Sequence, residues 1–162
     1  MAKKKDKKAS ISTGTIAKNK KAYFNFEIVE KIEAGISLKG SEVKSLRSGE
    51  ADLEGSYAKL KGSEVFLVGC KIATYPQAGK FNHDPVRDRK LLLHKAQINK
   101  IRGKLQQRGF TLVPLRIYFS GRGFAKVEIG LARGKKQFDK RQKLQQDQQK
   151  RDAERSMKYY KR

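Results

Sequence analysis

The sequence is poor in cysteine and histidine and has no apolar stretch long enough to cross a bilayer. Its single cysteine, Cys70, cannot form an internal disulfide, so we expect it to pack as a small core residue. With only His83 and His94 beside it, we expect no metal site and no cofactor. The basic N-terminal residues are not followed by an apolar segment as in a signal peptide, so we expect a cytoplasmic protein without a membrane partner.

Groups that could carry catalysis are also scarce. The pair His83 and Asp84 could serve a nuclease as its base, but neighbours in sequence do not orient one another like a catalytic triad. Asp84 is better explained as a helix cap before Pro85. The glycine-containing segments 121–123 and 134–136 lack the spacing of a phosphate-binding loop. We therefore expect no catalytic residues and no enzyme activity, with a nuclease as the weaker alternative.

Positive charge is what the sequence has in excess. It contains 39 Lys and Arg against 16 Asp and Glu, which gives a net charge of +23 over 162 residues. Such a chain repels itself strongly unless a polyanion neutralises it, so a phosphate backbone is the expected partner. Binding of this kind should weaken steeply with salt, because each neutralised phosphate releases counterions.

The central part of the sequence is patterned for a small β-rich domain. Alternating apolar residues predict strands over residues 23–32 and 36–38, a hairpin over 57–60 and 65–68, and a second hairpin over 111–119 and 125–131. Short helices are expected over 40–47, with Ser41 as N-cap, and from Asp84 to Gly109. About six strands without alternating crossover helices predict a mainly β fold, a closed antiparallel barrel with short helices.

The two ends of the chain differ from this centre. Residues 1–18 are basic and polar, which predicts a flexible arm. Residues 134–162 are rich in good helix formers but carry too few apolar residues to pack on the barrel, which predicts a basic tail that is disordered when free and helical on a partner. At helical spacing the tail has a basic stripe that includes Arg151, Arg155 and Lys158, opposite an apolar stripe that includes Met157. A tail that only improves solubility is the alternative.

Aromatic residues could add base stacking if they are exposed. The candidates are Tyr23, Tyr57, Tyr75, Phe81 and Phe138. Most aromatics in strands belong to a core, and for that reason we expect Phe24, Phe26, Phe66 and Phe119 to be buried.

Three sequence blocks together are similar to one known family. They are residues 40–47 (GSEVKSLR), 84–94 (DPVRDRKLLLH) and 134–141 (GKKQFDKR). In order and spacing they resemble the SsrA-binding protein family, the partner of transfer-messenger RNA in bacterial trans-translation. The resemblance implies an oligonucleotide-binding-like barrel that grips the tRNA-like domain of this RNA, and a tail that enters the decoding centre and empty mRNA channel of a stalled ribosome. It implies no catalysed reaction.

The resemblance also implies site residues. Asn19, Glu33, Leu93 and Lys126 match positions that the family uses to bind RNA. Lys126 can neutralise phosphate, Asn19 can donate to and accept from bases or 2′-hydroxyls, and Glu33 can accept from a guanine edge or orient a neighbouring Arg. The implied ribosome-binding residues at the start of the tail are Lys135, Lys136, Phe138, Asp139, Lys140 and Arg141. Phe138 stands where other members carry His, and Met157 falls in the segment that resembles the family's C-terminal helix.

The resulting hypothesis has three parts. Residues 1–18 form the arm, residues 19–133 the RNA-binding barrel domain and residues 134–162 the ribosome-binding tail. The expected protein is a monomer that delivers transfer-messenger RNA to stalled ribosomes and contacts small-subunit rRNA. The alternative is a structural ribosomal protein that binds rRNA permanently.

Overall fold

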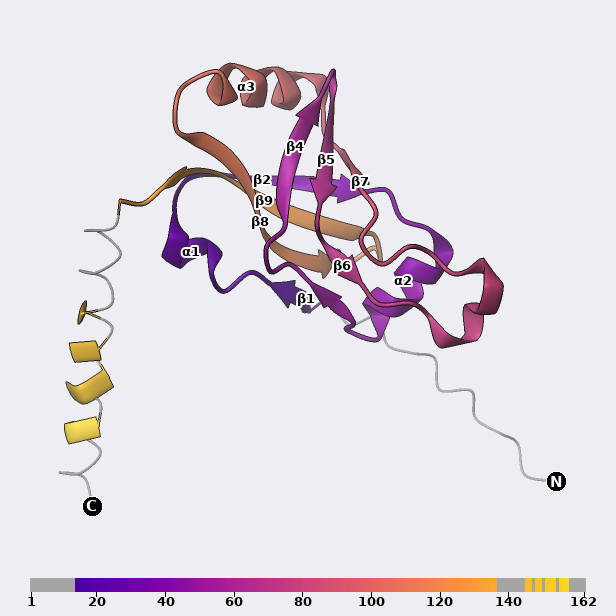
Figure 1. The fold of residues 1–162 in the computed structure, drawn as a ribbon, viewed down its shortest axis with the longest axis horizontal. Coiled ribbons are helices and arrows are strands. Elements are labelled where there is room, and N and C mark those ends of the chain that lie inside the picture. Colours follow the sequence, from indigo (N-terminus) through magenta and orange to yellow (C-terminus); the bar gives the residue numbers. More distant parts are fainter. Residues whose placement is uncertain (1–13, 137–144, 147, 150, 154, 158–162) are drawn as a thin grey trace.

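The computed structural model describes residues 14–136 and, further on, residues 145–146, 148–149, 151–153 and 155–157 (Figure 1). The elements of the first range follow one another as β1 (Thr15–Lys18), α1 (Ala22–Asn25), β2 (Phe26–Ile36), α2 (Gly40–Arg47), β3 (Ala51–Asp52), β4 (Tyr57–Lys61), β5 (Glu64–Val68), β6 (Lys71–Ile72), a 3₁₀ segment η1 (Pro76–Phe81), β7 (Arg89–Leu92), α3 (Lys95–Leu105), β8 (Phe110–Phe119) and β9 (Ala125–Gly134).

Six strands close into a barrel. The order β8-β4-β5-β7-β2-β9 returns to its start because β9 pairs with both β2 and β8, and every pairing is antiparallel. Because the ring is closed, each of its strands is paired on both sides over at least part of its length. β1 adds to the free part of β8, and β3 pairs with β6 in a separate two-stranded sheet. The predicted mainly β fold with a closed antiparallel barrel is confirmed.

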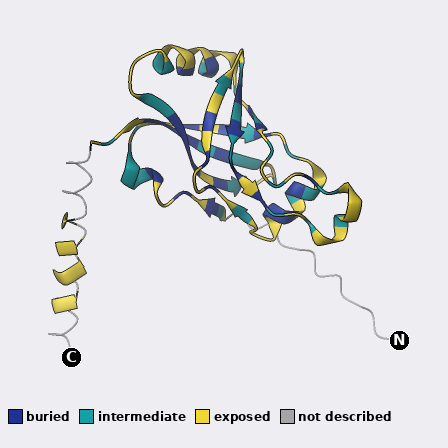
Figure 2. Ribbon diagram, viewed as in Figure 1, coloured by how far each residue is buried: buried dark blue, intermediate teal, exposed yellow. Residues whose placement is uncertain are grey.

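The core lies inside the ring, where buried and exposed residues alternate along the strands (Figure 2). On β2 the inward residues are Ile32, Ala34 and Ile36, and on β9 they include Val127 and Ile129. Side chains at period two point to one face of a strand, so this alternation is the physical source of the barrel interior. None of the helices in the described part of the chain is both long and apolar enough to cross a membrane.

Cys70 packs in this core, as the sequence predicts. Its side chain is fully buried. Burial disfavours the thiolate and raises the pKa of the thiol to about 11. Cys70 is therefore an apolar filler and not a reactive group.

Both predicted hairpins are present, as β4–β5 and β8–β9. The predicted helix over 40–47 is α2, with the same bounds, but its cap differs. Ser41 is not its cap: the Glu42 carboxylate accepts the N–H of Lys39 at 2.6 Å, while the Ser41 hydroxyl bonds to His83. The Glu42 carboxylate thus satisfies the free N–H of the N-cap residue Lys39, whereas a serine cap would accept an N–H from inside the first turn.

Two predicted elements are wrong in part. The strand expected from residue 23 begins with the short helix α1, and the helix expected from Asp84 consists of a turn, the strand β7 and only then α3. Asp84 accepts the N–H of Val86 at 2.9 Å, which closes a turn and caps no helix. In β7 the inward residues are Arg89 and Leu91. Because Arg89 is charged, the period-two pattern of this strand is hidden in the sequence.

The chain ends differ in part from the predicted arm and tail. Residues 15–18, expected in the arm, form β1 on the barrel. The described residues from 145 to 157 are helical and all exposed. The division into three parts, and the ordering of the tail on a partner, stay predictions.

Candidate nucleic-acid interface

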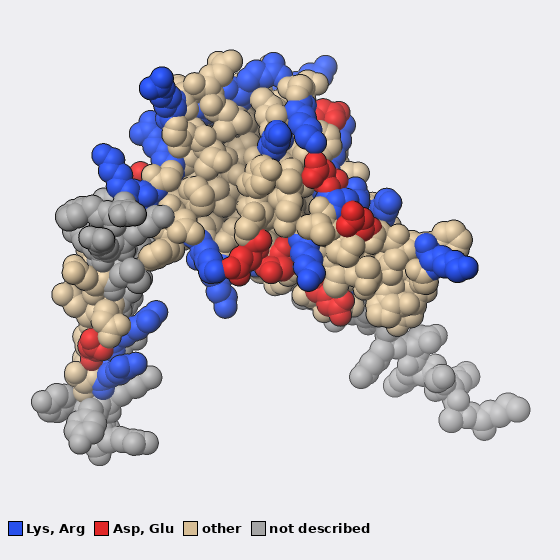
Figure 3. Space-filling model, viewed as in Figure 1, with Lys and Arg blue, Asp and Glu red and all other residues tan. Residues whose placement is uncertain are grey.

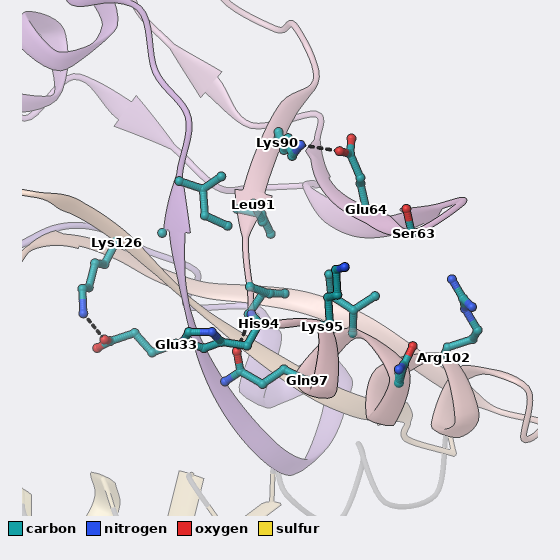
Figure 4. Close-up of a pocket in the computed structure, with 15 residues that line it drawn as sticks. Glu33, Ser63, Glu64, Lys90, Leu91, His94, Lys95, Gln97, Arg102 and Lys126 are labelled. Atoms are coloured by element: carbon teal, nitrogen blue, oxygen red, sulfur yellow. Dashed lines mark hydrogen bonds and ion pairs between the residues drawn. The ribbon is translucent and has the colours of Figure 1, made fainter.

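Lys and Arg side chains are spread over the molecule and occur along α3 and beside it (Figure 3). Below α3 lies an open groove of about 940 Å³. Its walls come from β2, the β4–β5 turn, β7 with the residues after it, α3 and one residue of β9 (Figure 4). Glu33, Leu93 and Lys126 line this groove, so the fold brings together three of the four RNA-binding residues that the sequence suggests.

A glycine permits the close antiparallel pairing of two strands in this wall. Gly35 of β2 lies opposite Leu92 of β7, and a Cβ built on Gly35 would meet the Leu92 Cβ at 3.2 Å. The missing side chain lets β7 approach β2 closely. Leu92 points outward and is 53% exposed, while Leu93 is half-buried at the end of the strand. The groove therefore has an apolar wall next to charged groups.

Cations and carboxylates alternate around the groove. Lys90 forms an ion pair with Glu64, and Lys126 forms one with Glu33 (Figure 4). The Arg102 guanidinium donates to the Gly62 carbonyl at 2.7 Å, which ties α3 to the β4–β5 turn. These side chains are positioned by partners within the protein before any ligand arrives.

Glu33 is the most constrained polar group of the groove. Its carboxylate accepts hydrogen bonds from Lys126 and from the Tyr118 hydroxyl, and both bonds lower the pKa of Glu33. Burial and the bond to Glu33 raise the pKa of Tyr118 to about 12, so the hydroxyl stays a donor at neutral pH. A carboxylate has lone pairs for further donors, such as a guanine edge or a 2′-hydroxyl. The neighbour that Glu33 orients is Lys126 and not an Arg.

Asn19 lies elsewhere. Its side chain is 7% exposed, and Nδ2 donates to the Pro114 carbonyl at 3.1 Å and to the Leu53 carbonyl at 3.5 Å, while Oδ1 accepts the N–H of Ala22 at 3.0 Å. It lines a separate cavity of about 360 Å³ beside Tyr57. The visible role of Asn19 is to hold the β1–α1 connection on β8. Its contact with RNA stays a prediction.

The predicted tail residues are only partly described. Lys135 is tied to the barrel, because its N–H donates to Asn25 at 3.0 Å and its Nζ to the Tyr23 carbonyl at 3.1 Å. Lys136 is exposed, as are Arg151, Arg155 and Met157 in the helical part. Phe138, Asp139, Lys140, Arg141 and Lys158 lie outside the described residues.

His83 and Asp84 are used by the fold. His83 is 3% exposed, its Nε2–H donates to the Ile72 carbonyl at 3.1 Å, and its Nδ1 accepts from the Ser41 hydroxyl at 2.9 Å. Since a carbonyl can only accept, these bonds fix which ring nitrogen carries the hydrogen. Asp84 closes the turn to Val86. The nuclease alternative therefore finds no available base at this pair.

The sequence analysis did not predict a buried ionic cluster that lies outside the groove lining. Glu42 and Arg89 are both fully buried and form an ion pair at 2.9 Å, and Arg87 donates to Glu42 at 2.6 and 2.8 Å. Arg89 also donates to the carbonyls of Cys70 and Pro85. The cluster links α2, the β5–β6 connection at Cys70, the turn at Pro85 and β7. In the sequence, the only indication of this cluster is that the segments 40–47 and 84–94 contain charged residues.

The electrostatics of Glu42 show why the cluster holds together. Burial acts to raise the pKa of Glu42, but hydrogen bonds from Arg87, from the Lys39 backbone and from Arg89 outweigh it and leave the pKa below its usual value. The carboxylate is therefore ionised in the folded protein at neutral pH.

Comparisons with known proteins agree on one family. The profile of the family described as SmpB protein matches residues 16–159. The SsrA-binding protein of Chloroflexus aurantiacus is 52% identical over 146 residues, 90% of this chain and 91% of that protein. That of Rickettsia bellii is 54% identical over 140 residues, 86% of this chain and 93% of that protein. A solved structure described as "tmRNA-SmpB: a journey to the center of the bacterial ribosome" has a TM-score of 0.63 and 52% identity, and covers 74% of this chain and 84% of its own.

Proposed function

Since the chain belongs to the SmpB protein family, we propose that it is an RNA-binding factor of trans-translation, which binds the tRNA-like domain of transfer-messenger RNA and delivers it to stalled ribosomes. The observation that carries this proposal is the convergence of Glu33, Leu93 and Lys126 on one groove. The protein acts as a cytoplasmic monomer, needs no cofactor and catalyses no reaction itself.

The groove has the chemistry to hold folded RNA. The Lys126 ammonium offers a charge-assisted hydrogen bond to phosphate, and the ionised Glu33 accepts from base or sugar donors beside it. Leu92 and Leu93 give these polar groups an apolar neighbour against which a sugar or base can lie. Unpaired and bent parts of an RNA present phosphates, 2′-hydroxyls and base edges together, and this combination suits such a groove better than a regular duplex does.

The tail supplies the second half of the proposed function. It begins with Lys135 and Lys136 and continues through Phe138, Asp139, Lys140 and Arg141 into a segment whose described residues are helical. Arg151, Arg155 and Met157 are exposed there, which leaves cations and an apolar side chain available to a partner. In the proposal this tail occupies the decoding centre and the empty mRNA channel, where rRNA provides phosphates and bases.

Replacement of Lys126 by alanine tests the groove. K126A is expected to weaken binding to purified transfer-messenger RNA by about tenfold, because one charge-assisted bond is lost and Glu33 is left without its ion-pair partner. The slope of log Kd against log salt should fall by roughly 0.7 to 0.9, as expected for one phosphate contact. Both values come from binding titrations at several salt concentrations.

Lys59→Ala is the matched control, since Lys59 is an exposed lysine on β4 that does not line the groove. It removes the same charge and should change Kd by less than about twofold at moderate salt. Equal losses in the two variants would show that diffuse attraction, and not the groove, binds the RNA.

A further inference from the structure

The connection between β6 and β7 carries an aromatic ring that the groove does not use. Phe81, at the end of η1, is 93% exposed, more than any other large apolar side chain in the described part of the chain. An apolar ring gains free energy only when a partner covers it. No groove-lining residue comes from this connection.

The exposure of Phe81 is not the result of a loosely tethered loop. Asn82, the next residue, accepts the N–H of Tyr75 at 3.1 Å and donates to the Tyr75 carbonyl at 2.8 Å, which joins the two ends of η1. His83 follows directly and is buried with both ring nitrogens bonded. At the turn, Gly79 has φ +49° and ψ −127°, a backbone conformation that side chains rarely allow. The fold thus holds Phe81 at a fixed place in solvent.

The residues near Phe81 indicate the chemical class of its partner. Lys80 precedes it and is exposed, and the Nζ of Lys44 on α2 lies 5.0 Å from the centre of the Tyr75 ring at the base of the loop. The Asp84 carboxylate nearby in sequence is turned to the N–H of Val86. A free ring next to Lys80, on a loop whose base carries Lys44 over Tyr75, matches an unpaired nucleobase with its phosphates, because bases stack on aromatic rings while lysines neutralise the backbone.

The ring and the groove occupy different parts of the barrel. Figure 1 shows α2 and the β6–β7 connection at one end of the molecule, whereas α3, which forms a groove wall, lies on another side. Side chains of Lys and Arg are visible at both places in Figure 3. An RNA in the groove would therefore leave the ring free for a second RNA segment.

We propose that Phe81 stacks on an unpaired RNA base, and that the β6–β7 connection is a second RNA contact of the barrel which acts together with the groove. This inference rests on the proposed function, since it takes the partner to be RNA. The base can belong to transfer-messenger RNA or to ribosomal RNA, and the chemistry is the same in both.

The test measures the affinity of the full-length chain for each source separately, purified transfer-messenger RNA and bacterial ribosomes. Phe81→Ala should weaken binding to one of them about tenfold, within the range that alanine substitution gives for a stacked base, with an unchanged salt slope because no charge is lost. Phe81→Trp should retain that affinity, since it keeps a stacking face, and Phe81→Leu should not. Val29→Ala, which trims a 56% exposed side chain on β2 outside both the groove and the β6–β7 connection, is the matched control and should match the wild type.

The outcomes separate the two proposals. If the wild type binds both sources and F81A binds each within twofold of it, the second contact is refuted and the proposed function stands. If Phe81→Leu binds as tightly as the wild type, the ring does not stack on a base and fits an apolar protein surface instead. If the wild type binds neither RNA, the proposed function fails together with this inference.

Discussion

Glu42→Gln is expected to lower the free energy of unfolding by about 3–5 kcal/mol, because it leaves the buried Arg89 and the half-buried Arg87 without their counter-charge. Glutamine keeps the shape of the side chain, so the loss reports charge and hydrogen bonding and not a cavity. The measurement is urea unfolding followed by circular dichroism, with the shift in midpoint converted through the slope of the wild type.

Glu64→Gln is the control, since the ion pair of Glu64 with Lys90 has both side chains more than 40% exposed. A pair of this kind contributes about 0–1 kcal/mol, so E64Q should unfold close to the wild type. Similar losses in E42Q and E64Q would contradict the account, because burial would then make no difference to the value of an ion pair.

The same cluster gives the wild type a pH dependence with a definite sign. The pKa of Glu42 is lowered by folding from its usual 4.5, so its stabilising contribution is complete above pH 4.5. It is lost as the pH falls further, towards and through the folded pKa. E42Q should lack this part of the acid sensitivity, and the stability difference between the two proteins should shrink as the pH falls below 4.5.

Truncation after Lys136 is expected to abolish ribosome rescue while binding of transfer-messenger RNA persists. The groove and its ion pairs lie within the residues that remain. The cut is placed after Lys136 because Lys135 is bonded to Asn25 and Tyr23, so a cut after Arg133 would also remove an attachment of α1 to the barrel. The readouts are peptide tagging on ribosomes stalled at the end of an mRNA and the Kd for the RNA.

The full-length double variant R151A/R155A separates the tail's charge from its length. If the basic stripe binds rRNA, this variant should lose most of the tagging activity although the chain is complete. Undiminished tagging by the truncated chain would show that the tail has no role on the ribosome. Loss of RNA binding on truncation would show instead that the tail belongs to the first binding step.

Local pattern sufficed for much of the fold. The two hairpins follow from alternation and turn residues, which act over short distances along the chain. Alternation failed at β7, where Arg89 occupies an inward position. A buried Arg is stable there only because Glu42, 47 residues earlier, and the carbonyls of Cys70 and Pro85 surround it. Such a long-range arrangement leaves no periodic mark in the sequence.

For the candidate site too, the sequence indicated some features and not others. The family resemblance implied Glu33, Leu93 and Lys126 by position, and the barrel brings these together although 93 residues separate Glu33 from Lys126. The resemblance did not show that Asn19 is buried against Pro114, because burial depends on β1 packing on β8. The sequence also did not show which aromatic side chains are exposed. Phe81 was a candidate for stacking, but Phe124, which is 68% exposed after the turn of the β8–β9 hairpin, was not.

The most direct test of the proposed function is to recover and sequence the RNA bound to the tagged protein in cells of its native organism. Three forms are compared: the full chain, the chain truncated after Lys136, and K126A. We predict that one transfer-messenger RNA dominates with the first two forms, that ribosomal RNA is lost on truncation, and that recovery of the dominant RNA falls in K126A. Recovery of ribosomal RNA alone, in stoichiometric amounts, by the full chain would contradict the account and favour a structural ribosomal protein.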